Sequence, residues 1–373
     1  MRRRPGYVLL NPGPVNTSSR VKGALIREDM CHRDAAFSEL FIRLTGKLRR
    51  IFHGGHDYSV LLLAGSGTAA MESAIASCVP EDGKILVVDN GAFGERLAEI
   101  ARLHELDLVH LRYDYGEQVR VEDVRASLDQ HPDVAVVAMV HHETSVGLLN
   151  PVREVGALCR ERDCLLLVDA VSSLGAEDLD VVRDHVDVCW ASANKCLHGI
   201  SGVSFTCVAP RAWPRIARVK PRVYYLDLKR YKHYADGRAQ TPFTPAVNTC
   251  FALEAACDEY LEQRGPSRQA LYTARNRRLR EGLRELGFHF FTETGRESHS
   301  VVTASLPDGI AFSQLFEDLK ARGFLIYDCK QPLQGKFFQI ANMGELSDST
   351  LDSFLDALAE CIGAAEMSRT VAL

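Results

Sequence analysis

The sequence predicts an α/β protein with a mostly parallel central sheet, followed by a smaller α+β region. Between residues 58 and 209, short apolar runs without polar alternation are separated by amphipathic helical patterns, as expected for parallel strands buried on both faces. After residue 249 the helical patterns lengthen and the strands become fewer. The chain has 373 residues, of which 46% are hydrophobic and 25% charged, as is typical of a globular protein with more than one domain.

In the first region, each expected element follows from its local pattern. A short run rich in Val, Ile and Leu predicts a strand, whereas apolar residues spaced three or four apart predict a helix. The expected strands are 59–64, 84–89, 134–140, 164–169, 186–191 and 203–208. The expected helices are 69–79, 93–103, 121–130 and 152–162. The alternation of the two types places this region in the α/β class.

The second region is predicted by the same rules. The expected helices are 250–263, 268–286, 312–322 and 349–362, and the expected strands are 288–291, 301–305, 324–327 and 337–341. The residues after Gly363 show no periodicity, so we expect them to fray.

Charge and hydropathy argue against several function classes. The net charge of −5 gives no positive field that would attract nucleic acid or anionic lipid. The basic, tyrosine-rich stretch 218–240 is therefore interpreted as a solvated or subunit-contacting surface. The apolar runs 60–64 and 164–168 are much shorter than the ~20 residues of a membrane span, and the N-terminus has no signal-peptide core. We expect a cytoplasmic protein that binds neither nucleic acid nor membrane.

The eleven cysteines contain no Cys-x-x-Cys pair, which disfavours a zinc or thioredoxin-like site. Most stand among apolar residues, so we interpret them as small buried hydrophobes and expect no metal.

The first candidate site residues form the tetrapeptide Gly65-Ser66-Gly67-Thr68, between an expected strand and an expected helix. Its glycines let backbone N–H groups approach an anion, its hydroxyls can donate, and the helix N-terminus adds positive potential. It is not Gly-x-Gly-x-x-Gly and no Gly-Lys-Ser/Thr follows, which disfavours a nucleotide site. Alternatively, the tetrapeptide is only a tight turn with a helix cap.

Two charged residues follow later strands of the same sheet. Asp169 ends the run 164–168, where the crevices of α/β sheets bind ligands. Lys195 follows the strand 186–191 among small and apolar neighbours, so desolvation can lower its pKa and leave a nucleophilic amine. Taken singly, Asp169 could cap a loop and Lys195 could be an ordinary surface lysine.

The combination indicates pyridoxal phosphate. An anion cup, an acid at a strand end and a lysine at a strand end supply what this cofactor requires for its phosphate, its pyridine nitrogen and its aldehyde. Phe93, after the strand 84–89, can lie flat on the cofactor ring, although a core aromatic at a helix start is the alternative interpretation.

At these residues the chain resembles the class V, fold-type I aminotransferases, and most closely the branch of the 2-aminoethylphosphonate–pyruvate transaminases, which shares features with the alanine–glyoxylate aminotransferases. The matching segments run in family order over nearly the whole chain: 10–14, 64–68, 90–94, 141–144 with Gly147 and 150–151, 168–173, 192–196, 244–245 and 340–345.

The resemblance implies roles for named residues. Lys195 would be the Schiff-base lysine, Asp169 would pair with the pyridine nitrogen, Phe93 would stack on the ring and Thr144 would lie near the cofactor's 3-oxygen. The phosphate would be held by Ser66, Gly67, Thr68 and Asn194. Thr241 and Thr244 would reach the phosphate in the neighbouring subunit, which implies a homodimer with shared active sites.

The resemblance also implies the domain organisation. A large cofactor-binding domain would span 15–255, and a small α+β domain would combine 1–14 with 256–373.

One position departs from the family pattern. Members of this branch carry a substrate-binding arginine where this chain has Gln339. Replacing a charged, bidentate donor by a neutral amide weakens the grip on a keto acid by about ten-fold or more, which argues against pyruvate as acceptor. Either Arg33 supplies the charge from another wall or the substrate differs. Asn11, Arg33 and Gln339 are therefore the expected substrate-binding residues.

The leading hypothesis is an aminotransferase for a small amine or amino acid, similar to 2-aminoethylphosphonate or belonging to secondary metabolism. The alternative is a lyase or oxidative deaminase/decarboxylase acting on an amino-acid conjugate, because such an enzyme needs no arginine at 339. A catalytically silent regulatory protein is disfavoured by the intact Lys195 and Asp169, and nucleic-acid binding through 218–240 is disfavoured by the acidic net charge.

Overall fold

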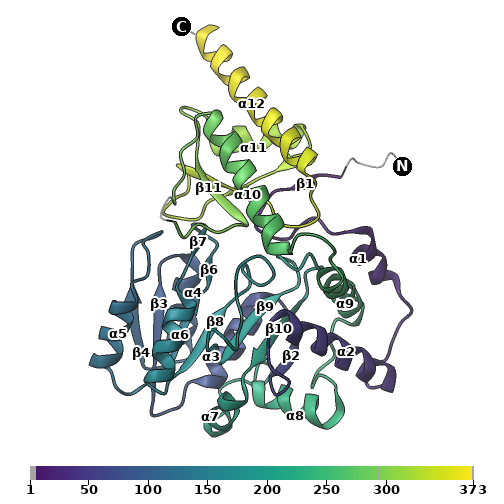
Figure 1. Cartoon of the computed structure of the whole chain (residues 1–373), viewed down its shortest axis with the longest axis vertical. Helices are drawn as coiled ribbons and strands as arrows, with labels where there is room; N and C mark the ends of the chain where they lie inside the picture. Colours follow the sequence, from purple (N-terminus) through teal and green to yellow (C-terminus); the bar gives the residue numbers. More distant parts are fainter. Residues whose placement is uncertain (1–5, 293–294, 372–373) are drawn as a thin grey trace.

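The computed structural model describes residues 6–292 and 295–371, with side chains as far as Gly363. Figure 1 shows a broad body that contains a large sheet and, above it, a narrower part formed by the C-terminal helices and a small sheet. The candidate residues of the sequence analysis lie mainly in the broad body, at one edge of its sheet.

The large sheet has seven strands, in the order β2-β10-β9-β8-β5-β3-β4. The pairs from β9 to β4 are all parallel, whereas β10 runs antiparallel to both of its neighbours. The predicted mostly parallel sheet is therefore confirmed. The strands are β2 (Ser59–Ala64), β3 (Lys84–Asp89), β4 (Leu108–Arg112), β5 (Val134–Val140), β8 (Leu165–Asp169), β9 (Val188–Ser192) and β10 (Val203–Val208).

Helices cover both faces of this sheet. Adjacent strand residues face opposite layers: Leu62 packs in one core cluster, while Leu61 and Leu63 pack in the other. The first layer holds α1 (Ser19–Gly23), the short 3-10 helix η1 (Ala24–Ile26), α2 (Ala35–Ile51), α5 (Val121–Gln130), α6 (Val152–Glu161) and α9 (Val247–Leu261). The second holds α3 (Gly67–Cys78), α4 (Ala92–Leu103), η2 (Pro210–Ala212), α7 (Trp213–Arg218) and α8 (Leu228–Arg238). This double burial explains why the strands read as continuous apolar runs.

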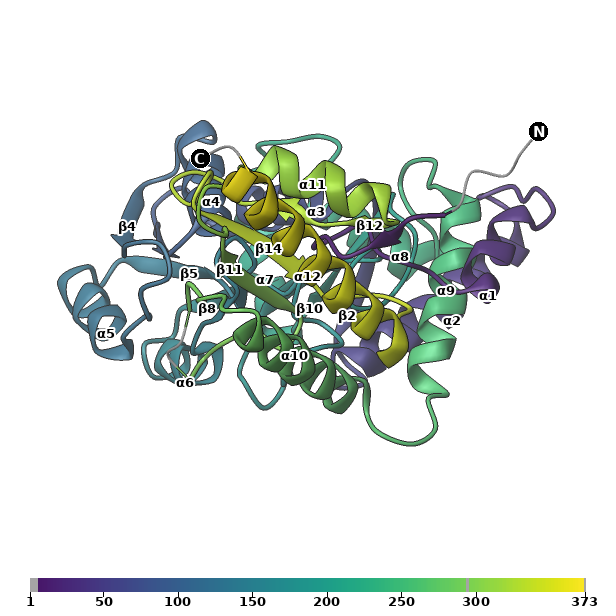
Figure 2. The same ribbon diagram turned by 90° about the horizontal axis from the view of Figure 1, so that it is seen from above.

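The narrower part has its own core, and both ends of the chain contribute to it (Figures 1 and 2). An antiparallel sheet of β11 (Val301–Ser305), β14 (Phe337–Ala341) and β13 (Tyr327–Asp328) packs with α10 (Arg268–Glu285), α11 (Phe312–Ala321) and α12 (Asp348–Val371). The N-terminal strand β1 (Val8–Leu9) pairs in parallel with β12 (Phe324–Leu325). A hairpin of β6 (His142–Glu143) and β7 (Leu148–Leu149) follows β5. The proposed division into domains 15–255 and 1–14 with 256–373 stays a prediction.

Three expectations about elements were wrong. Residues 288–291 form only an isolated bridge between Phe290 and Ala304, not a strand. The expected strand 324–327 is divided between β12 and β13, which pair in different sheets on either side of the buried Ile326. The last helix continues to Val371 instead of ending at Ile362 and fraying after Gly363, since the sequence 364–367 consists of strong helix formers.

Several elements were not anticipated, among them α2, α8 and β4. The strand β4 is half-buried and carries His110 and Arg112, so its polar residues hide it from a search for apolar runs.

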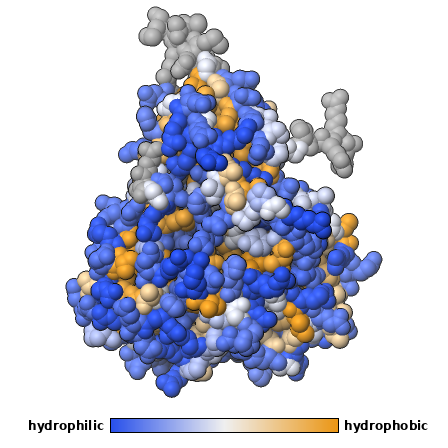
Figure 3. All heavy atoms as spheres, viewed as in Figure 1, coloured by the Kyte–Doolittle hydropathy of each residue, from blue (hydrophilic) through white to orange (hydrophobic). Residues whose placement is uncertain are grey.

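The cysteines agree with the sequence interpretation: Cys31 is exposed, and the other ten are buried free thiols. In the described part of the chain, no helix is long and apolar enough to cross a bilayer. The face of the molecule in Figure 3 is largely hydrophilic, with apolar residues scattered among polar ones.

Candidate functional site

A cavity of about 160 Å³ lies where the carboxyl ends of β5, β8 and β9 meet the N-termini of α3 and α4. Parallel strands converge at this edge of a sheet, which is where α/β proteins bind ligands. The cavity gathers eight of the predicted site residues: Ser66, Gly67, Thr68, Phe93, Thr144, Asp169, Asn194 and Lys195. It is also lined by Met71, Arg96, Val140, His142, Val171, Ser172 and Ser192.

The tetrapeptide 65–68 leads from β2 into the first turn of α3. Ser66 is the N-cap residue, but its hydroxyl makes no capping bond, so this side chain is available to an anion together with the first-turn N–H groups. A Cβ on Gly67 would lie 2.6 Å from Cγ2 of Val171. Glycine therefore lets the helix N-terminus approach the end of β8 closely.

Asp169, the last residue of β8, is buried and accepts a hydrogen bond of 2.8 Å from the Val171 backbone N–H. Burial raises the pKa of this carboxyl to about 6, although the positive charges of Arg96 and Lys195 act in the opposite direction. A buried acid with a raised pKa needs a cationic partner. A protonated pyridine nitrogen would supply one.

Lys195 follows β9 and is half-buried beside the N-terminal strip. Desolvation lowers the pKa of its ammonium to about 8, and the positive charges of Lys330 and Arg96 lower it further. The ammonium donates to the backbone carbonyl of Pro12. Gly13 has a φ of +97°, and a Cβ there would lie 2.6 Å from Cδ of Lys195, so glycine allows the strip to lie directly against the lysine side chain.

Phe93 is positioned by a carboxylate that the sequence analysis quoted in a motif without giving it a role. Glu143 is fully buried and accepts hydrogen bonds from the backbone N–H groups of Phe93, at 3.2 Å, and of Gly94, at 3.1 Å. The Ser145 hydroxyl also donates to it. Burial raises the pKa of Glu143 to about 7. This residue fixes the first turn of α4 and thereby the backbone that carries the ring.

Arg96 is a site residue that the sequence analysis missed. Its guanidinium donates to the Thr68 hydroxyl at 3.1 Å and lies 4.9 Å from the centroid of the Phe93 ring. The available signal was its spacing of three residues from Phe93, which places both on one face of a helix.

Two predicted substrate residues do not line this cavity. The Asn11 side chain donates to the Pro14 carbonyl at 2.9 Å. The guanidinium of Arg33 donates to the carbonyls of Thr241 and Pro242 at 2.7 and 2.8 Å. Arg33 therefore connects the loop that precedes α2 to the segment that follows α8.

Gln339, on β14, is buried and also lies outside this cavity. Its amide nitrogen donates to the Thr144 carbonyl at 2.6 Å and to the Thr303 hydroxyl at 3.1 Å. Both amide hydrogens are therefore used within the protein, which makes this residue a link between the small sheet and the loop after β6.

Thr241 and Thr244 also lie outside this cavity. The Thr241 hydroxyl is buried and donates to the Phe243 carbonyl at 2.7 Å, whereas Thr244 is exposed.

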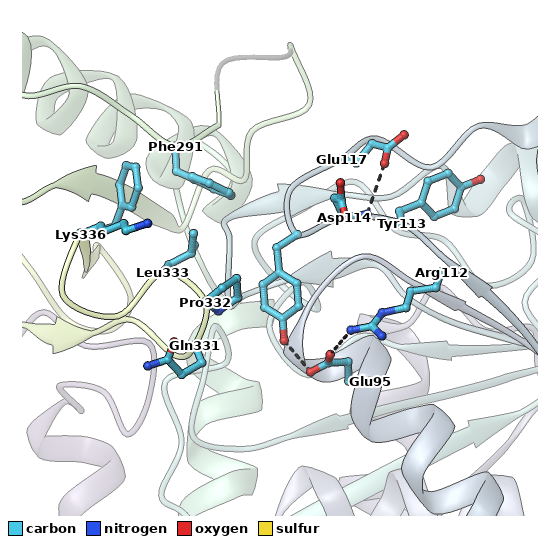
Figure 4. Close-up of a pocket in the computed structure, with 12 residues that line it drawn as sticks. Glu95, Arg112, Tyr113, Asp114, Glu117, Phe291, Gln331, Pro332, Leu333 and Lys336 are labelled. Carbon is cyan, nitrogen blue, oxygen red and sulfur yellow. Dashed lines mark hydrogen bonds and ion pairs between the residues drawn. The ribbon is translucent and has the colours of Figure 1, made fainter.

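A larger cleft of about 1050 Å³ lies beside α4 and shares no lining residue with this cavity. Figure 4 shows Glu95 beside Arg112, whose guanidinium donates to the Glu95 carboxylate at 2.9 Å. The Tyr115 hydroxyl donates to the same carboxylate at 2.6 Å. Glu95, Arg112 and Tyr115 of this cleft are paired with each other, and none of the predicted site residues lines it, so the chemistry of the site is assigned to the smaller cavity.

Comparisons with known proteins agree with this geometry. The profile of the family described as aminotransferase class-V matches residues 15–327. An uncharacterised aminotransferase of Methanocaldococcus jannaschii is 34% identical over 90% of this chain and 88% of its own length. A 2-aminoethylphosphonate–pyruvate transaminase of Burkholderia lata is 33% identical over 96% and 97%. The crystal structure of an alanine–glyoxylate aminotransferase from Nostoc sp. has a TM-score of 0.91, with 28% identity and 96% coverage of both chains.

The residues at the site fit pyridoxal 5′-phosphate, the cofactor that these similarities imply. The cup at Gly67 is a cradle that a Cβ would fill, Asp169 is a buried acid without an ion-pair partner in the described residues, and Lys195 is a partly desolvated amine. The fold is that of the fold-type I transferases. The chain is an enzyme and belongs to the class V aminotransferase family.

Proposed function

We propose that this enzyme transfers the amino group of a small amine or amino acid, either similar to 2-aminoethylphosphonate or belonging to secondary metabolism, to a carbonyl acceptor, with Lys195 as the residue that binds the cofactor aldehyde. The observation that supports this most strongly is the cavity itself. One cavity brings together an anion-binding turn at 66–68, a buried carboxylate and an amine whose pKa is lowered to about 8.

Each residue has a task in this proposal. Ser66, Gly67, Thr68 and Asn194 bind the cofactor phosphate, and Asp169 keeps the pyridine nitrogen protonated. When bound, the cofactor would supply an electron sink for the electron pair of the broken substrate C–H bond. Phe93 lies against the ring and Thr144 near its 3-oxygen. Lys195 removes the proton from the substrate α-carbon and delivers it to C4′, as a general base and then a general acid.

The alternative, a lyase or oxidative deaminase/decarboxylase, is not favoured. Curated relatives that match over nearly the whole chain are transaminases. Gln339 gives no separate support to the alternative, because its amide nitrogen donates to Thr144 and Thr303 within the protein.

The absorption spectrum of the loaded enzyme separates the two functions. We expect that an amine donor without keto acid converts one equivalent of cofactor to its pyridoxamine form and that the reaction then stops. Addition of a carbonyl acceptor should restore the original spectrum, and a panel that includes pyruvate and glyoxylate identifies which acceptor does so. Continuous product formation without any acceptor would contradict the proposal and support the lyase.

We further propose a homodimer in which Thr241 and Thr244 reach the phosphate in the neighbouring subunit. The exposure of Thr244 is compatible with such a contact. Sedimentation should give twice the chain mass of 41.4 kDa. If the sites are shared, a mixture of refolded Lys195→Ala and Thr244→Asp chains should regain activity that neither variant has alone. A monomer, or a mixture without activity, would overturn this arrangement.

A further inference from the structure

Two cations lie close to the ring that forms one wall of the cavity. The guanidinium carbon of Arg96 is 4.9 Å from the centroid of Phe93, and Nζ of Lys330 is 4.8 Å from it. Arg96 comes from α4 in the broad body, whereas Lys330 comes from the segment between β13 and β14 in the narrower part. The two parts of the molecule thus bring positive charge to one ring.

Neither cation has an ion-pair partner among the described residues. Within residues 6–292 and 295–371, no carboxylate lies within ion-pairing distance of Arg96 or Lys330. Arg96 is held by the Thr68 hydroxyl, while Lys330 is exposed. The exposed Lys330 ammonium thus lies beside Phe93, a residue of the cavity wall, without lining the cavity itself.

Lys330 lies near enough to Arg96 and Lys195 for the charges of these groups to affect one another. The pKa of Lys330 is lowered by partial desolvation and by the positive charge of Arg96, and the charge of Lys330 in turn lowers the pKa of Lys195. Arg96, Lys195 and Lys330 share one region with the buried carboxylates Asp169 and Glu143. Within the described residues, none of these three cations forms an ion pair. An anion placed among them would be stabilised, because like charges held close together favour a counterion.

The other polar residues considered for this task are engaged elsewhere. The guanidinium of Arg33 is occupied by the carbonyls of Thr241 and Pro242, and both amide hydrogens of Gln339 are occupied by Thr144 and Thr303. Lys330 is not among the residues that line the cavity, but its ammonium lies against Phe93, which does line it. Arg33 and Gln339 also lie outside the cavity, and these hydrogen bonds hold both side chains to other groups of the protein.

We propose that Lys330, supported by the charge of Arg96, binds the oxyanion of the substrate, a carboxylate or phosphonate at the end remote from the reacting nitrogen or carbonyl. This inference rests on the proposed function and adds to it the residue that would bind the acidic end of the substrate.

The test uses the cofactor-loaded enzyme and methylphosphonate as an inert probe, with binding measured by calorimetry. A lost charge-assisted contact predicts that Lys330→Met weakens binding by about ten-fold or more, while Lys330→Arg keeps most of the affinity. Lys320→Met is a matched control, because its ammonium also lies over a phenylalanine, 5.5 Å from the centroid of Phe316, but on α11. We expect this control to bind the probe as the wild type does.

The two half-reactions identify the source of the oxyanion. If Lys330 binds the donor, Lys330→Met should slow the half-reaction with 2-aminoethylphosphonate but not that with propylamine. If it binds the acceptor, the half-reaction with pyruvate should slow instead. Equal probe affinity in wild type and Lys330→Met, or no probe binding to the loaded wild type, would overturn the inference. Failure of the wild type to take up cofactor would instead overturn the proposed function.

Discussion

At the scale of single residues, the site depends on two groups whose charge states are set by burial. Lys195 is an amine that loses its proton more easily than an exposed lysine, and Asp169 is an acid that keeps its proton more strongly than an exposed aspartate. Both shifts have desolvation as their largest cause. Each gives a prediction for the cofactor-free protein.

The first concerns cofactor uptake as a function of pH. Since the neutral amine attacks the aldehyde, the rate constant for uptake should rise up to about pH 8, the pKa of Lys195, and then level off. Nα-acetyl-lysine serves as the reference, because the rate of its reaction with the same aldehyde also depends on the ionisation of the cofactor. The difference between the two pH profiles then reports the pKa of Lys195. The rates are followed by stopped-flow absorbance. A protein rate that keeps rising toward pH 10 in parallel with the reference would contradict the assignment.

The second concerns stability. The folded-state pKa of Asp169 is raised from 3.8 to about 6, so its charged form destabilises the cofactor-free protein above that range. Asp169→Asn should raise the unfolding free energy by about 3 kcal/mol at pH 7, and the gain should shrink as pH falls from 6 to 4. Urea titrations at several pH values measure it. A variant less stable than wild type at pH 7 would contradict this prediction, because it would show that interactions such as those with Arg96 and Lys195 offset the cost of burying the charged carboxylate.

At the scale of elements, the site depends on close approach of a helix N-terminus to a strand end. Much of this was accessible from the sequence, because an apolar run followed by Gly-Ser-Gly-Thr reads locally as a strand, a turn and a helix start. The same holds for Asp169 at the end of β8. In contrast, β4 was missed because its polar residues disguise it, and Phe288–Phe291 was overestimated because β propensity does not guarantee a pairing partner.

The close approach predicts the effect of Gly67→Ala. The new methyl group would lie 2.6 Å from Val171, so the cup must open, and overpacking of this kind typically costs about 1–3 kcal/mol. We expect cofactor affinity, measured by fluorescence titration, to fall about ten-fold. Gly46→Ala in α2 is the control, because nothing lies within 4 Å of its new Cβ and affinity should not change. Equal cofactor affinity in Gly67→Ala and Gly46→Ala would contradict the claim that cofactor binding needs a glycine at position 67.

At the scale of the whole molecule, the site is completed by segments far apart in the chain. Pro12 touches Lys195, Lys330 reaches Phe93, and Gln339 binds the Thr144 carbonyl. None of these contacts follows from local pattern, because each depends on how the narrower part packs on the broad body. For this reason the sequence could indicate residues at strand ends and helix starts, eight of which line one cavity, but it could not indicate what surrounds Arg33 and Gln339.

The link through Gln339 predicts a loss of stability in Gln339→Leu. Without the amide, the buried Thr144 carbonyl loses its donor, and an unsatisfied buried acceptor costs about 1–3 kcal/mol. Gln314→Leu removes an exposed amide bonded to Asp318 and should change the unfolding free energy by less than about 0.5 kcal/mol. Calorimetric unfolding of both variants makes the comparison. Equal stability would show that the link contributes nothing.

The most direct test of the central claim is chemical mapping of the cofactor attachment. The loaded enzyme is reduced with borohydride, digested and analysed by mass spectrometry. We expect the pyridoxyl phosphate group on Lys195 in the wild type and on no peptide in Lys195→Ala. Attachment to another lysine in the wild type, or no attachment after saturation with pyridoxal phosphate, would contradict the account.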